Sequence, residues 1–460
     1  MELQPTDRIH FIGIGGVSMS ALAHALADLG YRVSGSDRSD GPVLAQLRQA
    51  GVTAHVGHAA EHVADSDVVV YTTAIAGENP EILAARALGK KVFHRSELLA
   101  WLMRDKQAIA VTGTHGKTTC TAMLGVILEQ AGLDPTVFVG GLVNNWGCNY
   151  RLGRGPHIVF EACESDGSFL RYQGANQLVT GIEDDHLDQH KSSAALDQAF
   201  ADFLASADPD GFVTWYGDCA RLERLMGCTS ARPIRYGETD GAAYAACDIQ
   251  QDGSETRYRL VRGGQAAETV TLRVPGHHNV LNSLGAIATA EALGLEFGCI
   301  AGALADFRGT GRRFELLGRC NGLAIYDDYA HHPTEIRATL DTARCFGAER
   351  VIAIFQPHLY SRTLNLLEDF AHAFGQADVV IIDDIYAARE DPVPGVTGEL
   401  LADRVREVSG DKPVEYLPVR AELVRRVAEL AQPGDLILTI GAGDIRQAGE
   451  ALARQLCGGA

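Results

Sequence analysis

Short apolar runs alternate with stretches of helical periodicity along the first hundred residues. These runs predict strands at residues 9–14, 32–34, 68–71 and 91–93. Short strands with helical segments between them are typical of a parallel sheet that is covered on both faces. The pattern therefore predicts a doubly wound α/β domain over residues 1–106.

The same alternation returns in a second block, residues 107–311. Strands are predicted at 108–111, 158–160 and 177–179, and an Ala-rich helix at 286–295. Residues 239–274 are polar with alternating apolar positions, which predicts an antiparallel insertion or edge strands. The block ends at a glycine-rich, basic stretch, residues 309–313, which is a candidate hinge.

A third block covers residues 312–460. It has predicted strands at 324–326, 351–355, 379–382 and 436–440, with helical stretches between them. The sequence therefore predicts an α/β protein of three domains, which agrees with a length of 460 residues.

Charge and composition exclude several classes of protein. Lys and Arg number 40 against 59 Asp and Glu, a net charge of -19, which opposes general affinity for nucleic acid or an anionic membrane. No apolar run is long enough to span a bilayer, and the first residues lack the basic start of a signal peptide. The ten cysteines form no CxxC pair, so we expect reduced thiols in a cytoplasmic protein and no zinc site.

The loop after the strand at 108–111 has the composition of a phosphate-binding loop. Backbone N–H groups of such a loop, at the start of a helix, suit a polyphosphate. Lys117 is expected to reach the outer phosphates, and the Thr118 hydroxyl to bind Mg²⁺. The alternative is a tight strand-to-helix turn with an exposed lysine. The candidate ATP-binding residues of this loop are Gly113, Thr114, His115, Gly116, Lys117, Thr118 and Thr119.

Two acidic clusters follow the next predicted strands, at residues 161–166 and 183–188. Mg²⁺ prefers oxygen ligands and needs only one or two from protein. We therefore expect Glu161 to complete a magnesium site with Thr118, and His186 to serve a second ion. Each cluster on its own is also typical of a solvated loop.

The first domain opens with a glycine turn, Gly13, Gly15 and Gly16, and Asp37 follows at a spacing that resembles a dinucleotide fingerprint. The last glycine of that fingerprint is replaced by Ser18. The turn predicts a pyrophosphate site at most; an NAD-dependent oxidoreductase or a plain tight turn are the alternatives.

Two polar clusters follow strands of the third block, at residues 327–335 and 356–363. Arg362 suits a small carboxylate, because its planar guanidinium accepts bidentate pairing. His331 and His332 are adjacent, so they are expected to point apart. Residues that cap strand-to-helix turns are the alternative interpretation.

Together, the motifs at 112–119, 161–166, 183–186, 275–282, 311–314 and 328–335 resemble the Mur ligases, in the order of that family. The resemblance implies a Rossmann-like UDP-sugar domain, a P-loop ATPase-like central domain and a Rossmann-like domain for the amino acid. It also implies ATP and Mg²⁺ as cofactors, with Lys117, His186, His331, His332 and Arg362 as catalytic residues.

The resemblance assigns further residues to each ligand. It implies that Asn279, Asn282 and Arg313 contact ATP. It implies that Tyr329, His331, His358 and Arg362 bind the amino acid. The residues that it implies for the UDP-sugar are Gly13, Gly15, Gly16, Ser18, Met19, Asp37, Thr72, Thr73 and Arg95.

Within the family, residues 13–19, 73–75 and 356–363 resemble those of the branch that joins L-alanine to the lactyl carboxylate of UDP-N-acetylmuramate through an acyl phosphate. This implies a cytoplasmic enzyme of peptidoglycan synthesis, cell-wall biogenesis and cell division. The alternative in the same family is a murein-peptide recycling ligase that adds a tripeptide. A nucleotide-binding regulator without catalysis is disfavoured by the intact Lys117, Thr118 and Glu161.

Overall fold

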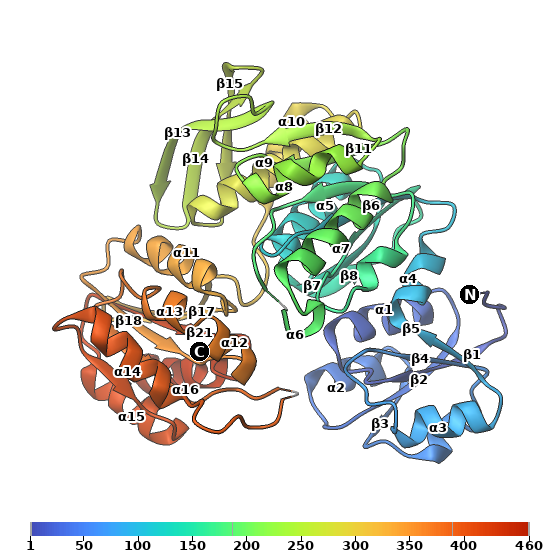
Figure 1. The fold of residues 1–460 in the computed structure, drawn as a ribbon, viewed down its shortest axis with the longest axis horizontal. Helices are drawn as coiled ribbons and strands as arrows, with labels where there is room; N and C mark the ends of the chain where they lie inside the picture. Colours follow the sequence, from blue (N-terminus) through green and yellow to red (C-terminus); the bar gives the residue numbers. More distant parts are fainter. Residues whose placement is uncertain (1, 186, 389, 459–460) are drawn as a thin grey trace. The chain divides into compact units, whose positions relative to one another are not determined.

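The computed structural model describes residues 2–185, 187–388 and 390–458. The chain forms two compact units (Figure 1). The first unit comprises residues 1–183, 189–244 and 283–303, and the second comprises 184–188, 245–282 and 304–460.

The first unit begins with a five-stranded sheet in which all neighbouring strands are parallel. Its order is β3-β2-β1-β4-β5, so the chain order reverses between β1 and β4. In such sheets ligands bind at the carboxyl ends of the strands beside the reversal. The elements are β1 (Arg8–Ile12), α1 (Val17–Asp28), β2 (Arg32–Asp37), α2 (Pro42–Gln49), β3 (Thr53–Val56), β4 (Val68–Tyr71), α3 (Pro80–Ala87), β5 (Lys91–His94) and α4 (Arg95–Leu102).

Seven neighbouring strands of a ten-stranded sheet lie in the first unit, in the order β12-β11-β10-β6-β9-β7-β8. These strands are parallel except for β8, which pairs antiparallel with β7. The strands are β6 (Gln107–Thr112), β7 (Thr136–Val143), β8 (Cys148–Arg151), β9 (His157–Glu161), β10 (Asn176–Val179), β11 (Phe212–Tyr216) and β12 (Arg232–Tyr236). The connecting helices are α5 (Lys117–Gln130), α6 (Leu187–His190), α7 (Ser193–Ala205) and α8 (Ala220–Leu225).

The predicted antiparallel pairing is confirmed for two of the three strands in this region, whereas β13 (Tyr244–Asp252) pairs parallel with β12. After β13, the strands β14 (Glu255–Arg262) and β15 (Gln265–Leu272) pair antiparallel. Helix α9 (His277–Ala292) begins before the predicted start at residue 286, directly after Gly276. It is followed by α10 (Phe297–Asp306).

The second unit contains a six-stranded sheet of order β16-β17-β21-β18-β19-β20. Only the edge strand β16 is antiparallel to its neighbour. The strands are β16 (Glu315–Cys320), β17 (Leu323–Asp328), β18 (Arg350–Phe355), β19 (Val379–Ile382), β20 (Val414–Tyr416) and β21 (Asp435–Ile440). The helices are α11 (Pro333–Arg344), α12 (Tyr360–Asn365), α13 (Leu367–Ala371), α14 (Gly398–Ser409), α15 (Arg420–Leu430) and α16 (Arg446–Cys457).

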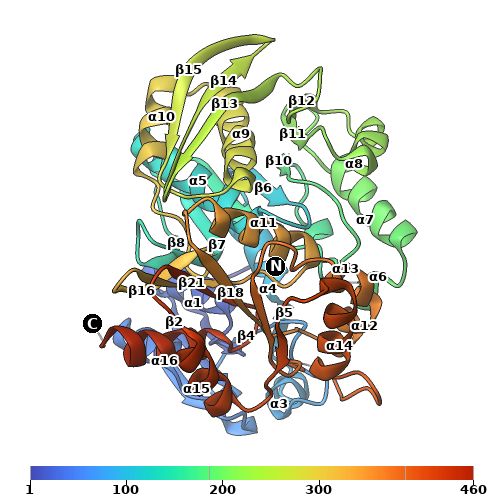
Figure 2. The ribbon, with the colours of Figure 1, turned by 90° about the vertical axis from the view of Figure 1, so that its left-hand side faces the viewer.

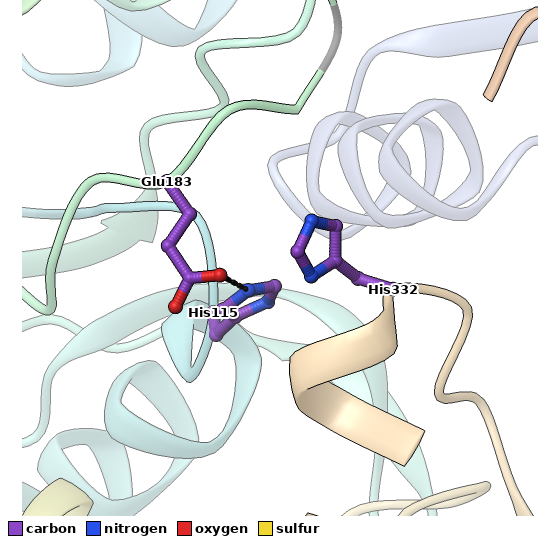
Figure 3. Close-up of side chains that lie close together, drawn as sticks. All are labelled: His115, Glu183 and His332. Atoms are coloured by element: carbon purple, nitrogen blue, oxygen red, sulfur yellow. Dashed lines mark ion pairs between the residues drawn. The ribbon is translucent and has the colours of Figure 1, made fainter. Parts of the chain in front are cut away.

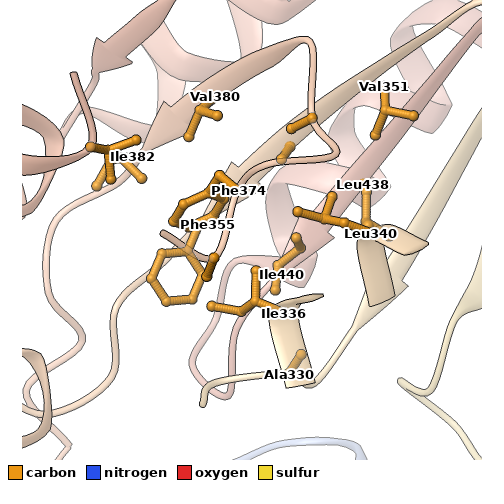
Figure 4. Packing of buried hydrophobic residues seen from close by; sticks show 14 of the residues in the cluster. Ala330, Ile336, Leu340, Val351, Phe355, Phe374, Val380, Ile382, Leu438 and Ile440 are labelled. Carbon is orange, nitrogen blue, oxygen red and sulfur yellow. The ribbon is translucent and has the colours of Figure 1, made fainter. Parts of the chain in front are cut away.

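Alternate residues of β18 enter two separate cores, as the two-residue period of a strand requires. Val351 and Phe355 pack with α11 and α14 on one face (Figure 4). Ile352 and Ile354 pack on the other face with α15 and α16, which lie side by side in Figure 2. The continuous apolar run of this strand is thus explained by burial on both faces.

The expectation that all ten cysteines are reduced is wrong for one pair. Cys320, at the end of β16, forms a disulfide with Cys457, at the end of α16, and the Cα atoms lie 5.3 Å apart. Sequence spacing gave no sign of this pair, because 137 residues separate the two cysteines. The other eight cysteines are free thiols.

Within the described residues, no helix has both the length and the apolar character needed to cross a membrane.

Candidate active site

The loop between β6 and α5 has a backbone that only glycine accommodates at two points. Gly113 and Gly116 have φ values of 126° and 80°. A Cβ on Gly113 would also lie 2.3 Å from Thr180 Oγ1. The turn therefore leads from a buried strand straight to the start of a helix of 14 residues, where backbone N–H groups suit an anion.

Residues after β10 support this loop from behind. The Thr180 hydroxyl donates to the carbonyl oxygens of Thr112 and His115. The backbone N–H of Glu183 donates to the Thr114 hydroxyl at 2.8 Å. Glu183 also forms an ion pair with His115 at 3.5 Å (Figure 3). These contacts hold the loop through two neighbouring strand ends.

The Lys117 ammonium is held inside its own loop. It donates to the carbonyl oxygens of Gly113 and Thr114 and, at 3.0 Å, to the carboxylate of Glu164. Burial acts to lower the pKa of Lys117, but the negative charge of Glu164 outweighs burial and the pKa rises to about 12. Lys117 is therefore a permanent positive charge at the phosphate loop.

Thr118 and Glu161 lie against the same pair of glycines in β7. A Cβ on Gly140 would lie 2.5 Å from Glu161 Oε2, and a Cβ on Gly141 would lie 3.3 Å from Thr118 Cγ2. The N–H of Gly140 donates to the Glu161 carboxylate. A hydroxyl and a carboxylate are hard oxygen ligands, which fit Mg²⁺. The remaining predicted metal ligand, His186, lies outside the described residues.

The glycine turn after β1 is held by the predicted acidic residue. Gly13 has a φ of 80°, and the N–H of Gly15 donates to Asp37 Oδ2 at 2.9 Å. Gly16 then caps α1. Of the two helix residues predicted to bind the sugar nucleotide, Ser18 is exposed, but Met19 is only 2% exposed and belongs to the core.

A cavity of about 360 Å³ lies at the carboxyl ends of β4 and β5. The Thr73 hydroxyl lies 3.0 Å from His94 Nε2 in its wall. Burial and the charge of Arg95 lower the pKa of His94 to about 4, so this imidazole is neutral near pH 7. Thr73 was predicted here, whereas the other lining residues were not: Tyr71, Ile75, His94, Asp166, Gly167, Ser168 and Arg171.

Asp166 is bonded to two residues that were predicted to bind the UDP-sugar. Its carboxylate accepts from the Thr73 hydroxyl at 2.9 Å and from Arg95 Nη2 at 3.1 Å. Burial acts to raise the pKa of Asp166, but the hydrogen bonds of Ser168 and the charge of Arg95 overcome it, so the pKa lies below its ordinary value. Asp166 is an ionised wall residue of the cavity.

In the second unit, Arg362 is buried, and each of its three guanidinium nitrogens lies within hydrogen-bond distance of a side chain. Its Nε and Nη2 both donate to Asp185 Oδ1, at 3.0 and 2.8 Å, and its Nη1 lies 3.1 Å from His358 Nδ1. The ring centroids of His331 and His358 lie 6.1 Å apart. Three of the predicted amino-acid-binding residues therefore gather at the ends of β17 and β18, and Asp185 joins them without having been predicted.

The histidines before α11 have different surroundings. Burial lowers the pKa of His331 to about 4 despite the carboxylate of Glu335, 3.3 Å away. His332 caps α11 by accepting from the Thr334 N–H. Tyr329 lies under two guanidinium groups, those of Arg312 and Arg313, at 5.0 and 5.4 Å.

Two of the residues predicted to contact ATP, Asn279 and Asn282, lie in the first turns of α9. The Asn279 amide donates to the carbonyl of Pro275 at 2.7 Å, and the Asn282 amide donates to Asn279 at 3.1 Å. Both side chains are buried. Arg313 pairs with Glu335 at 3.7 Å.

Three family profiles match successive parts of the chain. The profile "Mur ligase family, catalytic domain" matches residues 8–107, "Mur ligase middle domain" matches 111–290, and "Mur ligase, glutamate ligase domain" matches 312–443. Two solved structures are similar over 98% of this chain. They are a UDP-N-acetylmuramate-alanine ligase from Thermotoga maritima (30% identity, TM-score 0.85, 99% of that chain) and a murein peptide ligase from Psychrobacter arcticus (27% identity, TM-score 0.72, 98% of that chain).

Curated relatives extend the similarity over the whole sequence. The chain is 44% identical to the UDP-N-acetylmuramate--L-alanine ligase of Pelotomaculum thermopropionicum, over 97% of both chains. It is 43% identical to the enzyme of the same name from a Geobacter species, over 98% of both chains. This chain belongs to the Mur ligase family.

Proposed function

We propose that this protein is an ATP-dependent ligase that joins L-alanine to the lactyl carboxylate of UDP-N-acetylmuramate. The observation that carries the proposal is the Lys117 loop, in a chain that is 44% identical to ligases of that name over nearly its full length. We further propose three functional domains, at residues 1–106, 107–311 and 312–460.

The chemistry requires activation of a carboxylate. A carboxylate does not acylate an amine in water, because it resists nucleophilic attack and has no good leaving group. Transfer of the γ-phosphoryl group of ATP to the carboxylate gives an acyl phosphate; the amine then attacks the carbonyl and phosphate leaves. Catalysis of the first step depends on positioning and on neutralising charge.

Each part of the chain supplies one element of this scheme. Lys117 and the loop N–H groups bind the ATP phosphates. Bound Mg²⁺, held by Thr118 and Glu161 with His186 at a second ion, would neutralise further phosphate charge. Asn279, Asn282 and Arg313 bind the rest of the nucleotide.

The UDP-sugar is proposed to bind at the carboxyl edge of the first sheet. The glycine turn and Asp37 lie beside the reversal of strand order, where a pyrophosphate suits the start of α1. Thr72 and Thr73 follow β4, and Arg95 follows β5. Thr73 and Arg171 line the neighbouring cavity, and Arg95 adds a positive charge beside Asp166 in its wall.

L-Alanine is proposed to bind near Arg362. A guanidinium held by Asp185 and His358 is fixed in place, and the carboxylate of the amino acid can take up a position beside it. His331 is neutral near pH 7, so it can accept a hydrogen bond from the amine and orient it.

A murein-peptide ligase is the second candidate, because a solved enzyme of that name covers 98% of this chain. Its lower identity and TM-score favour the L-alanine ligase. We place the enzyme in the cytoplasm, where ATP and UDP-sugars are made, and in peptidoglycan synthesis.

Isotope transfer tests the proposal. UDP-N-acetylmuramate labelled with ¹⁸O in its carboxylate is incubated with ATP, Mg²⁺ and L-alanine, and the released phosphate is analysed by mass spectrometry. One ¹⁸O per phosphate is expected, because phosphate leaves the acyl phosphate with the bridging oxygen, which came from the carboxylate. Unlabelled phosphate would contradict the acyl phosphate route, and no phosphate release would contradict the ligase activity.

A further inference from the structure

A single short segment contacts both proposed nucleotide sites of the first unit. Residues 161–166 begin at the last residue of β9 and lead to a 3₁₀ turn, Ser168–Arg171. Glu164 in this segment holds Lys117, and Asp166 holds Thr73 and Arg95. The cations proposed for ATP and for the UDP-sugar are thus bound by carboxylates only two residues apart.

Glu164 depends on Lys117. Glu164 is 2% exposed, and its Oε2 makes no hydrogen bond within the described part of the chain. The backbone carbonyl oxygen of Glu164 lies 2.8 Å from His190 Nε2. A buried carboxylate that loses a paired cation is costly, so movement of Lys117 toward a phosphate must displace Glu164.

Asp166 occupies the donors that an anionic ligand would use. The hydroxyl of Thr73, Nη2 of Arg95 and the N–H of Ser168 all donate to its carboxylate. The side chain of Asp166 is 10% exposed and that of Arg95 15%. A phosphate or carboxylate of the UDP-sugar at Arg95 must therefore compete with Asp166.

We propose that Glu164 and Asp166 are positioning residues that couple the ATP site to the UDP-sugar site. Each carboxylate stands in for a ligand anion when its site is empty. When the ATP phosphates take Lys117, Glu164 loses its partner and the segment shifts, which weakens the bonds of Asp166 to Thr73 and Arg95. The UDP-sugar then binds more tightly, and by reciprocity it favours ATP to the same degree.

The coupling rests on the proposed function and is measured without catalysis. The Kd of UDP-N-acetylmuramate is determined by titration calorimetry with and without Mg²⁺ and a non-hydrolysable β,γ-methylene analogue of ATP. In the wild type we expect the analogue to lower this Kd about fivefold or more. Asp134→Asn is the matched control, because Asp134 forms an ion pair with Arg151 at 2.8 Å outside the segment; it should keep the wild-type coupling.

Two variants each replace one of the two carboxylates with a neutral amide. In Asp166→Asn, the Kd of the UDP-sugar should already be low without the analogue, and the analogue should change it less than about twofold. In Glu164→Gln, the analogue itself should bind more tightly and the coupling should again be lost. A purely structural role would instead lower the thermal midpoint and weaken both ligands.

Wild-type coupling in both variants would overturn the inference, as would weaker binding of the UDP-sugar to Asp166→Asn. Such a result, with normal ligation, would leave the proposed function intact. A wild-type enzyme that binds neither ligand would contradict the proposed function together with the coupling.

Discussion

At the scale of single residues, the site is built from charges that already have partners. Lys117 is paired with Glu164, Arg95 with Asp166 and Arg362 with Asp185. Such pairing lowers the free-energy cost of burying a charge. A ligand anion can then replace or join the protein carboxylate. Mutations at these positions should therefore separate binding from turnover.

Lys117→Ala should abolish ligation. Loss of a charge that stabilises the transferred phosphoryl group costs about 10²–10³ in rate or more. Measured by phosphate release, kcat should fall by at least that factor, while calorimetry should show no loss of UDP-N-acetylmuramate affinity, because Arg95 and the glycine turn are intact. A comparable loss of UDP-sugar affinity would contradict this division of labour.

Arg362→Lys should raise the KM for L-alanine about tenfold with little change in the KM for ATP, because a lysine replaces a planar bidentate donor with a point charge. The buried pair with Asp185 makes some loss of stability expected as well. Arg404→Lys, at an exposed pair with Glu368, is the control. A folded Arg362→Lys enzyme with an ordinary alanine KM would remove Arg362 from the amino-acid site.

His331 should make stability depend on pH. Burial lowers its folded-state pKa from 6.5 to about 4, so the unfolded chain takes up the proton first as pH falls. The contribution of neutral His331 is complete above pH 6.5, declines between 6.5 and 4, and amounts to roughly 3 kcal/mol at most. The free energy of unfolding is measured by denaturant titration at pH 7 and at pH 4.5. Between these two pH values, His331→Gln should lose less free energy of unfolding than the wild type does. His372→Gln, at an exposed histidine, should lose as much as wild type.

At the scale of elements, the ends of strands position the site residues, and continuous apolar runs in the sequence predict the strands. Strands buried on both faces, such as β4, β6 and β18, were predicted because their sequences are continuously apolar. Strand β7 was missed because Gly140 and Gly141 interrupt it, and their small size is explained only by Thr118 and Glu161 against them. The half-buried edge strand β3 was missed for lack of an apolar run.

The same limit applies to the site. The Lys117 loop, Thr118 and Glu161 were predicted because their chemistry is local and follows one strand each. The partners Glu164 and Asp185 could not be paired with Lys117 and Arg362 from sequence, because 47 and 177 residues separate them. Only the fold brings these charges together.

The disulfide links helix α16 to the edge strand β16, and its removal should destabilise the packing of this helix on the sheet. Cys457→Ala should lower the free energy of unfolding by about 2–4 kcal/mol, as is typical for a bridge that closes a long loop. Cys345→Ala, at an exposed free thiol, should leave it near wild type. Equal midpoints for Cys457→Ala and wild type, under oxidising conditions, would contradict a stabilising bridge.

At the scale of the whole molecule, three sheets follow one another along the chain, and each presents polar residues at the carboxyl ends of parallel strands. Three such edges match three substrates: a sugar nucleotide, ATP and an amino acid. Because the net charge is -19, the proposed binding of anionic ligands depends on local cations, chiefly Lys117, Arg95 and Arg362.

A competition assay tests the central claim most directly. The protein is incubated with ATP, Mg²⁺ and UDP-N-acetylmuramate in the presence of equal concentrations of L-alanine and the murein tripeptide, and the product masses are measured. We predict a product heavier by one alanyl residue, with one ADP formed per product. We predict no product when ATP is omitted, and none when L-alanine and the tripeptide are both omitted. A product that carries the tripeptide, or no ATP-dependent product at all, would contradict the assignment.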